Sequence, residues 1–138
     1  MSSPEAFSGI ETYLTANWTA TPLVFENPQD PTPADQPAHF LFVEIVGNAF
    51  DQVSIGADPT ISNRWREWGQ IFLHVMTKNG IGSRQARVFA KQALDLFRGN
   101  EDAGIRPRGM SIGAGEPGVP IANYFAMTAI VDFEKDHD

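Results

Sequence analysis

The chain has 138 residues and a mass of 15.2 kDa, a size at which one compact domain that needs no disulfide or metal to fold is the default. It contains no cysteine, which excludes disulfide scaffolds, thiolate metal sites and thiol nucleophiles. Its net charge of −7 argues against a function that depends on gripping phosphate backbones; with neither a membrane-length apolar run nor a leader pattern, we expect a soluble, unexported protein with no membrane partner.

The N-terminal residues predict an amphipathic helix. Ser3 is a favourable N-cap and Pro4 fits the first helical position. Apolar residues then recur at spacings of three and four, at Phe7, Ile10, Leu14 and Trp18. Pro22 ends the helix, because the residue before a proline is pushed out of the α region. Gly9 costs this helix about 1 kcal/mol relative to alanine, so docking rather than propensity must hold it.

Two strands separated by a proline-rich loop follow. Residues 23–26 form a short strand signal, and residues 27–38 carry four prolines, which predicts a stiff surface loop. Residues 40–55 are rich in β-branched and aromatic side chains but are interrupted at Gly47 and Asn48. This pattern favours one long strand with a bulge or bend over a hairpin.

The middle of the chain predicts a long strand and the best-defined helix. Residues 64–78 alternate, with Ile71, Leu73 and Val75 on one side and a mixed polar and aromatic set on the other. After a turn at 79–82, Ser83 is positioned to cap a helix whose apolar stripe consists of Ala86, Phe89, Ala90, Ala93, Leu94 and Phe97. Gly99 can close that helix in the left-handed conformation.

The last third predicts a loop and a final strand. Residues 99–120 are read as a glycine-rich loop with a short strand signal at 109–112, and residues 124–135 alternate as a strand. Together these elements predict one α+β domain spanning residues 1–138. We expect a largely antiparallel sheet of four to five strands with two helices packed on one face.

Charge is unevenly distributed along the chain. Residues 1–63 contain eight acidic and no basic residues (−8), residues 64–108 contain nine basic and four acidic (+5), and residues 109–138 contain one basic and five acidic (−4). Ordinary variation over a small surface is one explanation. The alternative is a molecule with opposed acidic and basic faces, suited to head-to-tail contacts.

No constellation of residues predicts catalysis. The G-x-G-x-x-G run at residues 113–118 contains an acid and a proline and does not lead into a helix, as a dinucleotide site requires. The three histidines are far apart in sequence, and the acids Asp132, Glu134 and Asp136 share one face of a terminal strand, which is typical of a solvated strand end. We therefore expect no enzymatic activity, no cofactor and no metal.

The remaining candidate for function is a contact surface. The tryptophan and arginine content of residues 64–68 resembles that of binding anchors, and the mixed second face of the predicted sheet is costly to leave in water. The candidate interface residues, chosen from this segment and from the basic block, are Arg64, Trp65, Arg66, Arg84, Arg87, Arg106 and Arg108.

With these elements in order, the chain resembles the tail terminator proteins of long-tailed bacteriophages and phage-like gene transfer agents over nearly its full length. The resemblance rests on the helix leading into Trp18-x-x-Thr21-Pro22, on Arg64-x-x-x-x-Gly69 before an apolar strand, and on the final Tyr124-Phe125-x-Met127 strand. The rich proline loop and the acidic tail depart from the family pattern.

The resemblance implies a structural role at the head-proximal end of a virion tail, after assembly in the host cytoplasm. Such proteins form a six-membered ring that caps the tail tube, ends its polymerisation and offers a docking surface to the head–tail connector. DNA passes through that ring without specific binding, and Asp132 and Glu134 are the candidate residues facing its lumen.

Two other classes of function stay open. One is a head–tail joining or completion protein of the same particle, which would share the size and composition but bind on the portal side. The other is a small α+β ligand-binding domain unrelated to phages.

Overall fold

The computed structural model describes residues 3–25, 37–56, 63–78, 80–113, 119–121 and 124–137. Their elements, in chain order, are α1 (Pro4–Asn17), β1 (Leu23–Phe25), β2 (Phe40–Gln52), β3 (Trp65–Lys78), α2 (Arg84–Phe97), β4 (Arg106–Ile112), β5 (Val119–Ile121) and β6 (Tyr124–His137). The predicted α+β class is confirmed. The proline-rich loop falls outside the described residues except for 37–38, and the G-x-G-x-x-G run does so except for Gly113.

The strands of the described chain form one mixed, mainly antiparallel sheet of order β1-β2-β3-β6-β4, and the short β5 pairs with β6 as well. Among the described strands, β1 and β2 are the only pair that runs parallel. The register between β2 and β3 shifts between Gly47 and Ala49, so the predicted bulge is confirmed. The short strand predicted at residues 109–112 is confirmed as part of β4, which begins three residues earlier, at Arg106. Strand β5 was not predicted, and it brings the described sheet to six strands where four or five were expected.

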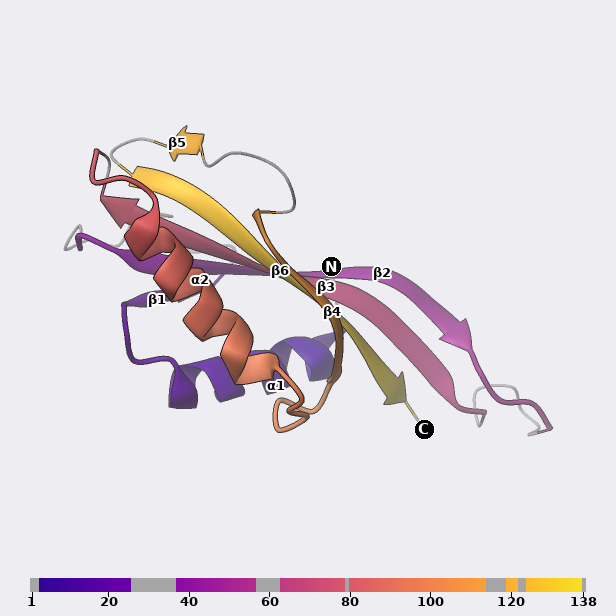
Figure 1. Ribbon diagram of the computed structural model, residues 1–138. Coiled ribbons are helices and arrows are strands. Elements are labelled where there is room, and N and C mark those ends of the chain that lie inside the picture. The colour runs from indigo at the N-terminus through magenta and orange to yellow at the C-terminus, as the bar shows by residue number, and fades with distance from the viewer. Residues whose placement is uncertain are drawn as a thin grey trace.

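Both helices contribute to one core. Buried residues of α1 and the whole predicted stripe of α2 share a cluster with odd-numbered residues of three strands, among them Ile45, Ile71 and Val131. Figure 1 shows both helices on the same side of the sheet. We call the opposite side, which carries the even-numbered residues of β3 and β6, the open face. One end of this face is buried in a second cluster of Phe40, Met76, Tyr124 and Ala126.

The two helix caps differ from each other. Ser3 caps α1 as predicted, because its hydroxyl accepts a hydrogen bond from the amide of Ala6 at 3.2 Å. Ser83 stands at the N-cap position of α2, but its hydroxyl instead accepts from Nε of Arg87. Helix α1 ends at Asn17, with Trp18 already extended, a few residues before the end expected from Pro22.

Close packing explains two of the glycines. A Cβ on Gly9 would collide with the carbonyl oxygen of Ala103, so this glycine lets α1 approach the segment after α2. A Cβ on Gly69 would collide with the carbonyl oxygen of Val46 and lie 2.7 Å from the ring of Phe133. The fold therefore needs the missing side chain at both positions.

Candidate assembly surface

The structure divides the predicted interface residues between two places. Arg64, Trp65 and Arg66 start β3, beside the end of β6, and the neighbouring strand β4 brings Arg106 and Arg108 to the same region. Arg84 and Arg87 instead lie on α2, where both are exposed and line a shallow hollow with Ser83, Val88, Lys91 and Gln92. The sequence-adjacent basic block is therefore two separate surfaces in space.

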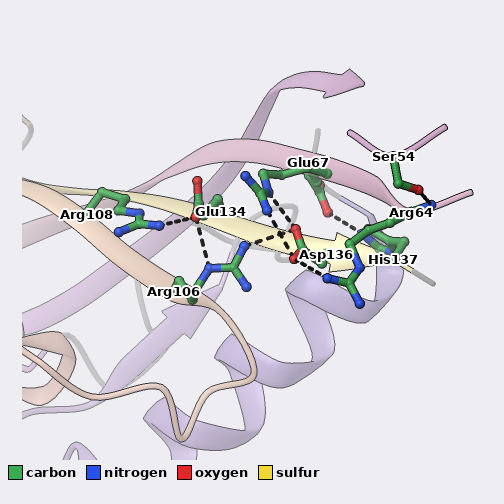
Figure 2. A network of polar contacts seen from close by, with 9 residues as sticks. Ser54, Arg64, Glu67, Arg106, Arg108, Glu134, Asp136 and His137 are labelled. Atoms are coloured by element: carbon green, nitrogen blue, oxygen red, sulfur yellow. Dashed lines mark hydrogen bonds and ion pairs between the residues drawn. The ribbon is translucent and has the colours of Figure 1, made fainter. Parts of the chain in front are cut away.

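Asp136 is the centre of the first surface (Figure 2). Its Oδ1 accepts hydrogen bonds from Nε of Arg66 at 2.6 Å and from Nη2 of Arg106 at 3.0 Å, and Arg64 lies at 4.0 Å. The hydrogen bond from Arg66, followed by that from Arg106, holds the pKa of Asp136 far below its ordinary value. This carboxylate therefore stays charged and connects β3, β6 and β4.

Glu134 is the second anion of the network. Its Oε1 accepts from Nε of Arg106 at 2.9 Å and also from Nη2 of Arg108. The hydrogen bond from Arg108 lowers the pKa of Glu134 more than burial raises it, and Arg106 lowers it further. The side chain of Glu134 is 8 % exposed whereas that of Arg108 is 59 % exposed. In this pair the arginine faces solvent and the carboxylate of Glu134 is buried.

The network as a whole carries excess positive charge. Four guanidinium groups (Arg64, Arg66, Arg106, Arg108) meet the two carboxylates of Glu134 and Asp136. Of the two residues predicted to face a lumen, Glu134 is thus already paired within the chain. Asp132 is exposed and accepts a hydrogen bond from the Gln70 amide at 2.9 Å.

A second polar cluster fastens α1 to the same end of the sheet. The buried carboxylate of Glu67 accepts from the amide of Ser3 at 2.7 Å and from its hydroxyl at 2.6 Å, and Nε2 of His137 lies 3.2 Å away. Burial raises the pKa of Glu67, but the hydrogen bonds from Ser3 and His137 outweigh it and the net pKa is lowered. The sequence contained no local signal for this pairing across 64 residues.

A polar chain crosses the middle of the open face. His74 on β3 places Nε2 at 2.5 Å from Glu44 on β2 and Nδ1 at 2.8 Å from Thr128 on β6. The ring lies near the aromatic rings of Phe42 and Phe72. A hydroxyl, an imidazole and a carboxylate in this order resemble a hydrolase triad, but Glu44 is 43 % and His74 is 24 % exposed on the surface of a sheet. These hydrogen bonds connect β2, β3 and β6 and stabilise their register.

Among the described residues, no group of three or more histidine or acidic side chains is arranged to hold a metal. The same part of the chain has no buried side-chain nitrogen or oxygen without a hydrogen-bond partner. No helix in it is both long enough and apolar enough to cross a bilayer.

Exposed apolar residues lie where β2 ends, a feature that the sequence did not predict. Phe50 is 49 %, Val53 is 39 % and Ile55 is 92 % exposed. Phe50 lies near the rings of Trp65 and His137, with centroid distances of 6.2 and 4.8 Å. Figure 1 shows β2 and β3 continuing past the helices at this end. Phe50 pairs in register with Glu67, so it lies on the helix side of the sheet, opposite the face that carries the arginine network.

No family model and no curated protein matches the sequence. Solved structures do match, in 24 chains. One of them aligns with a TM-score of 0.59 and 18 % identity, over 97 % of this chain and 95 % of that chain. At this identity the likeness shows the fold alone, shared over nearly the whole of both chains.

Proposed function

We propose that the protein is a subunit of a ring, six-membered as in the terminators it resembles, that caps the tail tube of a long-tailed phage or a phage-like gene transfer agent. The ring ends tube polymerisation and offers a surface to the head–tail connector. The observation that carries this proposal is the sheet with its helices on one side only, while its open face carries half-buried aromatic residues and an ion network.

The open face favours a role in assembly. Trp68, Phe72 and Phe42 are half-buried on it, beside the charged end formed by the arginine network. Large apolar side chains left partly in water at a polar rim are typical of surfaces that another protein covers. The open face is thus suited to a neighbour rather than to a small substrate.

The charge distribution favours a closed ring over a two-fold dimer. A ring built by head-to-tail contacts needs two different, complementary patches on each subunit. The arginine network is one basic patch on the open face, while Glu5 and Glu11 are acids on α1, on the helix side of the sheet. Opposite charges on separate surfaces also speed association and select the partner.

The test is the oligomeric state and its consequence for tails. Light scattering on the purified protein should show hexamers, in solution or on added tail tubes. Deletion of the gene should leave normal heads and give overlong tails in electron micrographs. Short or absent tails would instead indicate a head–tail joining protein, and a strict monomer inert toward tubes would indicate a small ligand-binding domain.

A further inference from the structure

Both edges of the sheet have strands with one side unpaired in the described structure. Strand β1 pairs with β2 only at residues 41–43 of the latter, so residues 46–52 of β2 have no described strand on their outer side. At the opposite edge, β4 pairs with β6 alone. Backbone amides and carbonyls on such edges are templates for pairing with another chain.

The two edges differ in how far they are protected against pairing. Residues 46–52 of β2 contain no lysine, arginine or proline, although the bulge between Gly47 and Ala49 interrupts this edge. The exposed Phe50 lies in this stretch, and the exposed Val53 and Ile55 follow it directly. Strand β4 begins with Arg106, Pro107 and Arg108, residue types that restrict edge pairing, and ends in Ile112, which is 39 % exposed. Both edges therefore carry apolar surface that a partner strand would cover.

Charges on the two edges are complementary. Asp51 is exposed at the end of β2, and among the described residues the guanidinium of Arg66, its neighbour in register, is bonded to Asp136 instead. Asp51 pairs in register with Arg66 and so lies on the open face. Arg106, opposite Glu134, begins β4 on the same face, and Arg108 follows it. The β2 edge thus offers a carboxylate where the β4 edge offers surplus guanidinium groups.

We propose that the free edge of β2 in one copy pairs with the free edge of β4 in the next copy, so that the sheets join head-to-tail. Because β3 and β6 are antiparallel to each other and to β2 and β4 respectively, β2 and β4 run in opposite directions. In a ring whose axis runs along the strands, each copy is related to the next by a rotation that leaves strand directions unchanged. The β2 edge of one copy and the β4 edge of the next therefore meet as an antiparallel pair. The end of β2, with Asp51, then meets the beginning of β4, with Arg106 and Arg108.

This contact deepens the proposed function, on which it rests, because it supplies the heterologous interface of a ring. It is asymmetric by construction: one edge of each copy binds the other edge of its neighbour. A two-fold dimer would instead join identical edges. Single cysteines distinguish the two arrangements, and the cysteine-free chain gives an unreactive background.

The experiment cross-links the edges with a short bis-maleimide. Asn48→Cys labels the β2 edge and Ser111→Cys labels β4. The double variant should give cross-linked species of every size up to the closed oligomer. A mixture of the two single variants should give cross-linked dimers, and each single variant alone should give no cross-linked product. Asn48→Cys combined with Gln92→Cys, a residue on the exposed side of α2, is the control and should give no ladder.

A charge variant provides an independent measurement. Asp51→Lys places like charges opposite Arg106 and Arg108 and should weaken association about tenfold or more in light scattering, with an unchanged urea midpoint. Hexamers that form without the β2–β4 cross-link, or unimpaired association of Asp51→Lys, would overturn the edge pairing and leave the proposed ring standing. Monomers that neither cross-link nor bind tail tubes would overturn the ring function itself.

Discussion

At the scale of single residues, the end of the sheet depends on Asp136. Its carboxylate accepts hydrogen bonds from arginines on two strands, β3 and β4, while it sits on a third. Its pKa is held far below the ordinary value by these hydrogen bonds. A carboxyl with a lowered folded-state pKa stabilises the protein above its unfolded-state pKa, and that stability is lost as the pH falls.

We expect Asp136→Asn to flatten the pH dependence of stability. In the wild type the unfolded chain binds a proton at Asp136 near pH 4 whereas the folded chain resists it, so the free energy of unfolding falls below about pH 5. Urea unfolding at pH 7, 5 and 3 measures this slope. The variant should be less stable at pH 7 and lose less on acidification. Asp132→Asn is the matched control, because the described contact of Asp132 is one hydrogen bond from the Gln70 amide. An equal dependence of unfolding free energy on pH in Asp136→Asn and the wild type would contradict the expectation.

Gly69 gives a second prediction at the residue scale. A methyl group there meets the backbone of the half-buried Val46 and the ring of the buried Phe133. Gly69→Ala should therefore destabilise the fold by about 1–3 kcal/mol through overpacking, read from the urea midpoint at constant slope. A midpoint equal to that of the wild type would show that β2 can shift without cost.

At the scale of elements, α2 is held by its apolar stripe. Phe89 is 9 % exposed and its ring lies 6.3 Å from that of Trp18 and 5.4 Å from that of His39. This one side chain therefore connects α2 to the end of α1 and to the start of β2. The C-terminal end of α2 has a separate tie, because the hydroxyl of Tyr13 donates to the carbonyl of Leu96 at 2.5 Å.

Phe89→Ala should lower the free energy of unfolding by about 3–5 kcal/mol, because it removes a large side chain and leaves a cavity between three elements. The neighbouring Val88 is 44 % exposed on the same helix. Val88→Ala is the matched control and should stay within about 0.5 kcal/mol of the wild type. Comparable losses in both variants would mean that α2 contributes through helix propensity rather than docking.

At the scale of the whole molecule, function depends on how charged surfaces meet other molecules. Arg87 is exposed on α2, away from the arginine network. Arg87→Glu should leave the urea midpoint within about 0.5 kcal/mol of the wild type and reduce the hexamer fraction in light scattering. Unchanged association would remove Arg87 from the interface residues while leaving Arg106 and Arg108 in place.

A charge reversal at Asp132 tests whether this residue faces the lumen of the proposed ring. It is exposed, whereas Glu134 beside it is paired with two arginines. In particles assembled with Asp132→Lys, DNA ejection should slow without a loss of assembly, because a cation in the channel attracts the phosphate backbone. Ejection at the wild-type rate would place Asp132 outside the channel.

Local sequence patterns predict most elements of this protein and its α+β class. Alternation with period two placed β2, β3 and β6, and the stripe of α2 emerged residue for residue, because local backbone geometry fixes which side chains share a face. The interruption at Gly47 and Asn48 indicated the bulge. Local signals were too weak to predict the start of β4 and the whole of β5. Both lie in a stretch rich in glycine and proline, where pairing with β6 overrides propensity.

The contacts between distant side chains could not be predicted from local patterns. Asp136 contacts Arg66 across 70 residues and Arg106 across 30, Glu67 contacts Ser3 across 64, and His74 joins Glu44 to Thr128. The pairs between strands follow from the register of β2, β3, β6 and β4, and register is set by burial summed over whole strands rather than by any neighbouring residue. The pair of Glu67 and Ser3 follows instead from the docking of α1 on the sheet. For the same reason the basic residues of 64–108, which are continuous in sequence, form two separate surfaces, one on β3 and β4 and the other on α2.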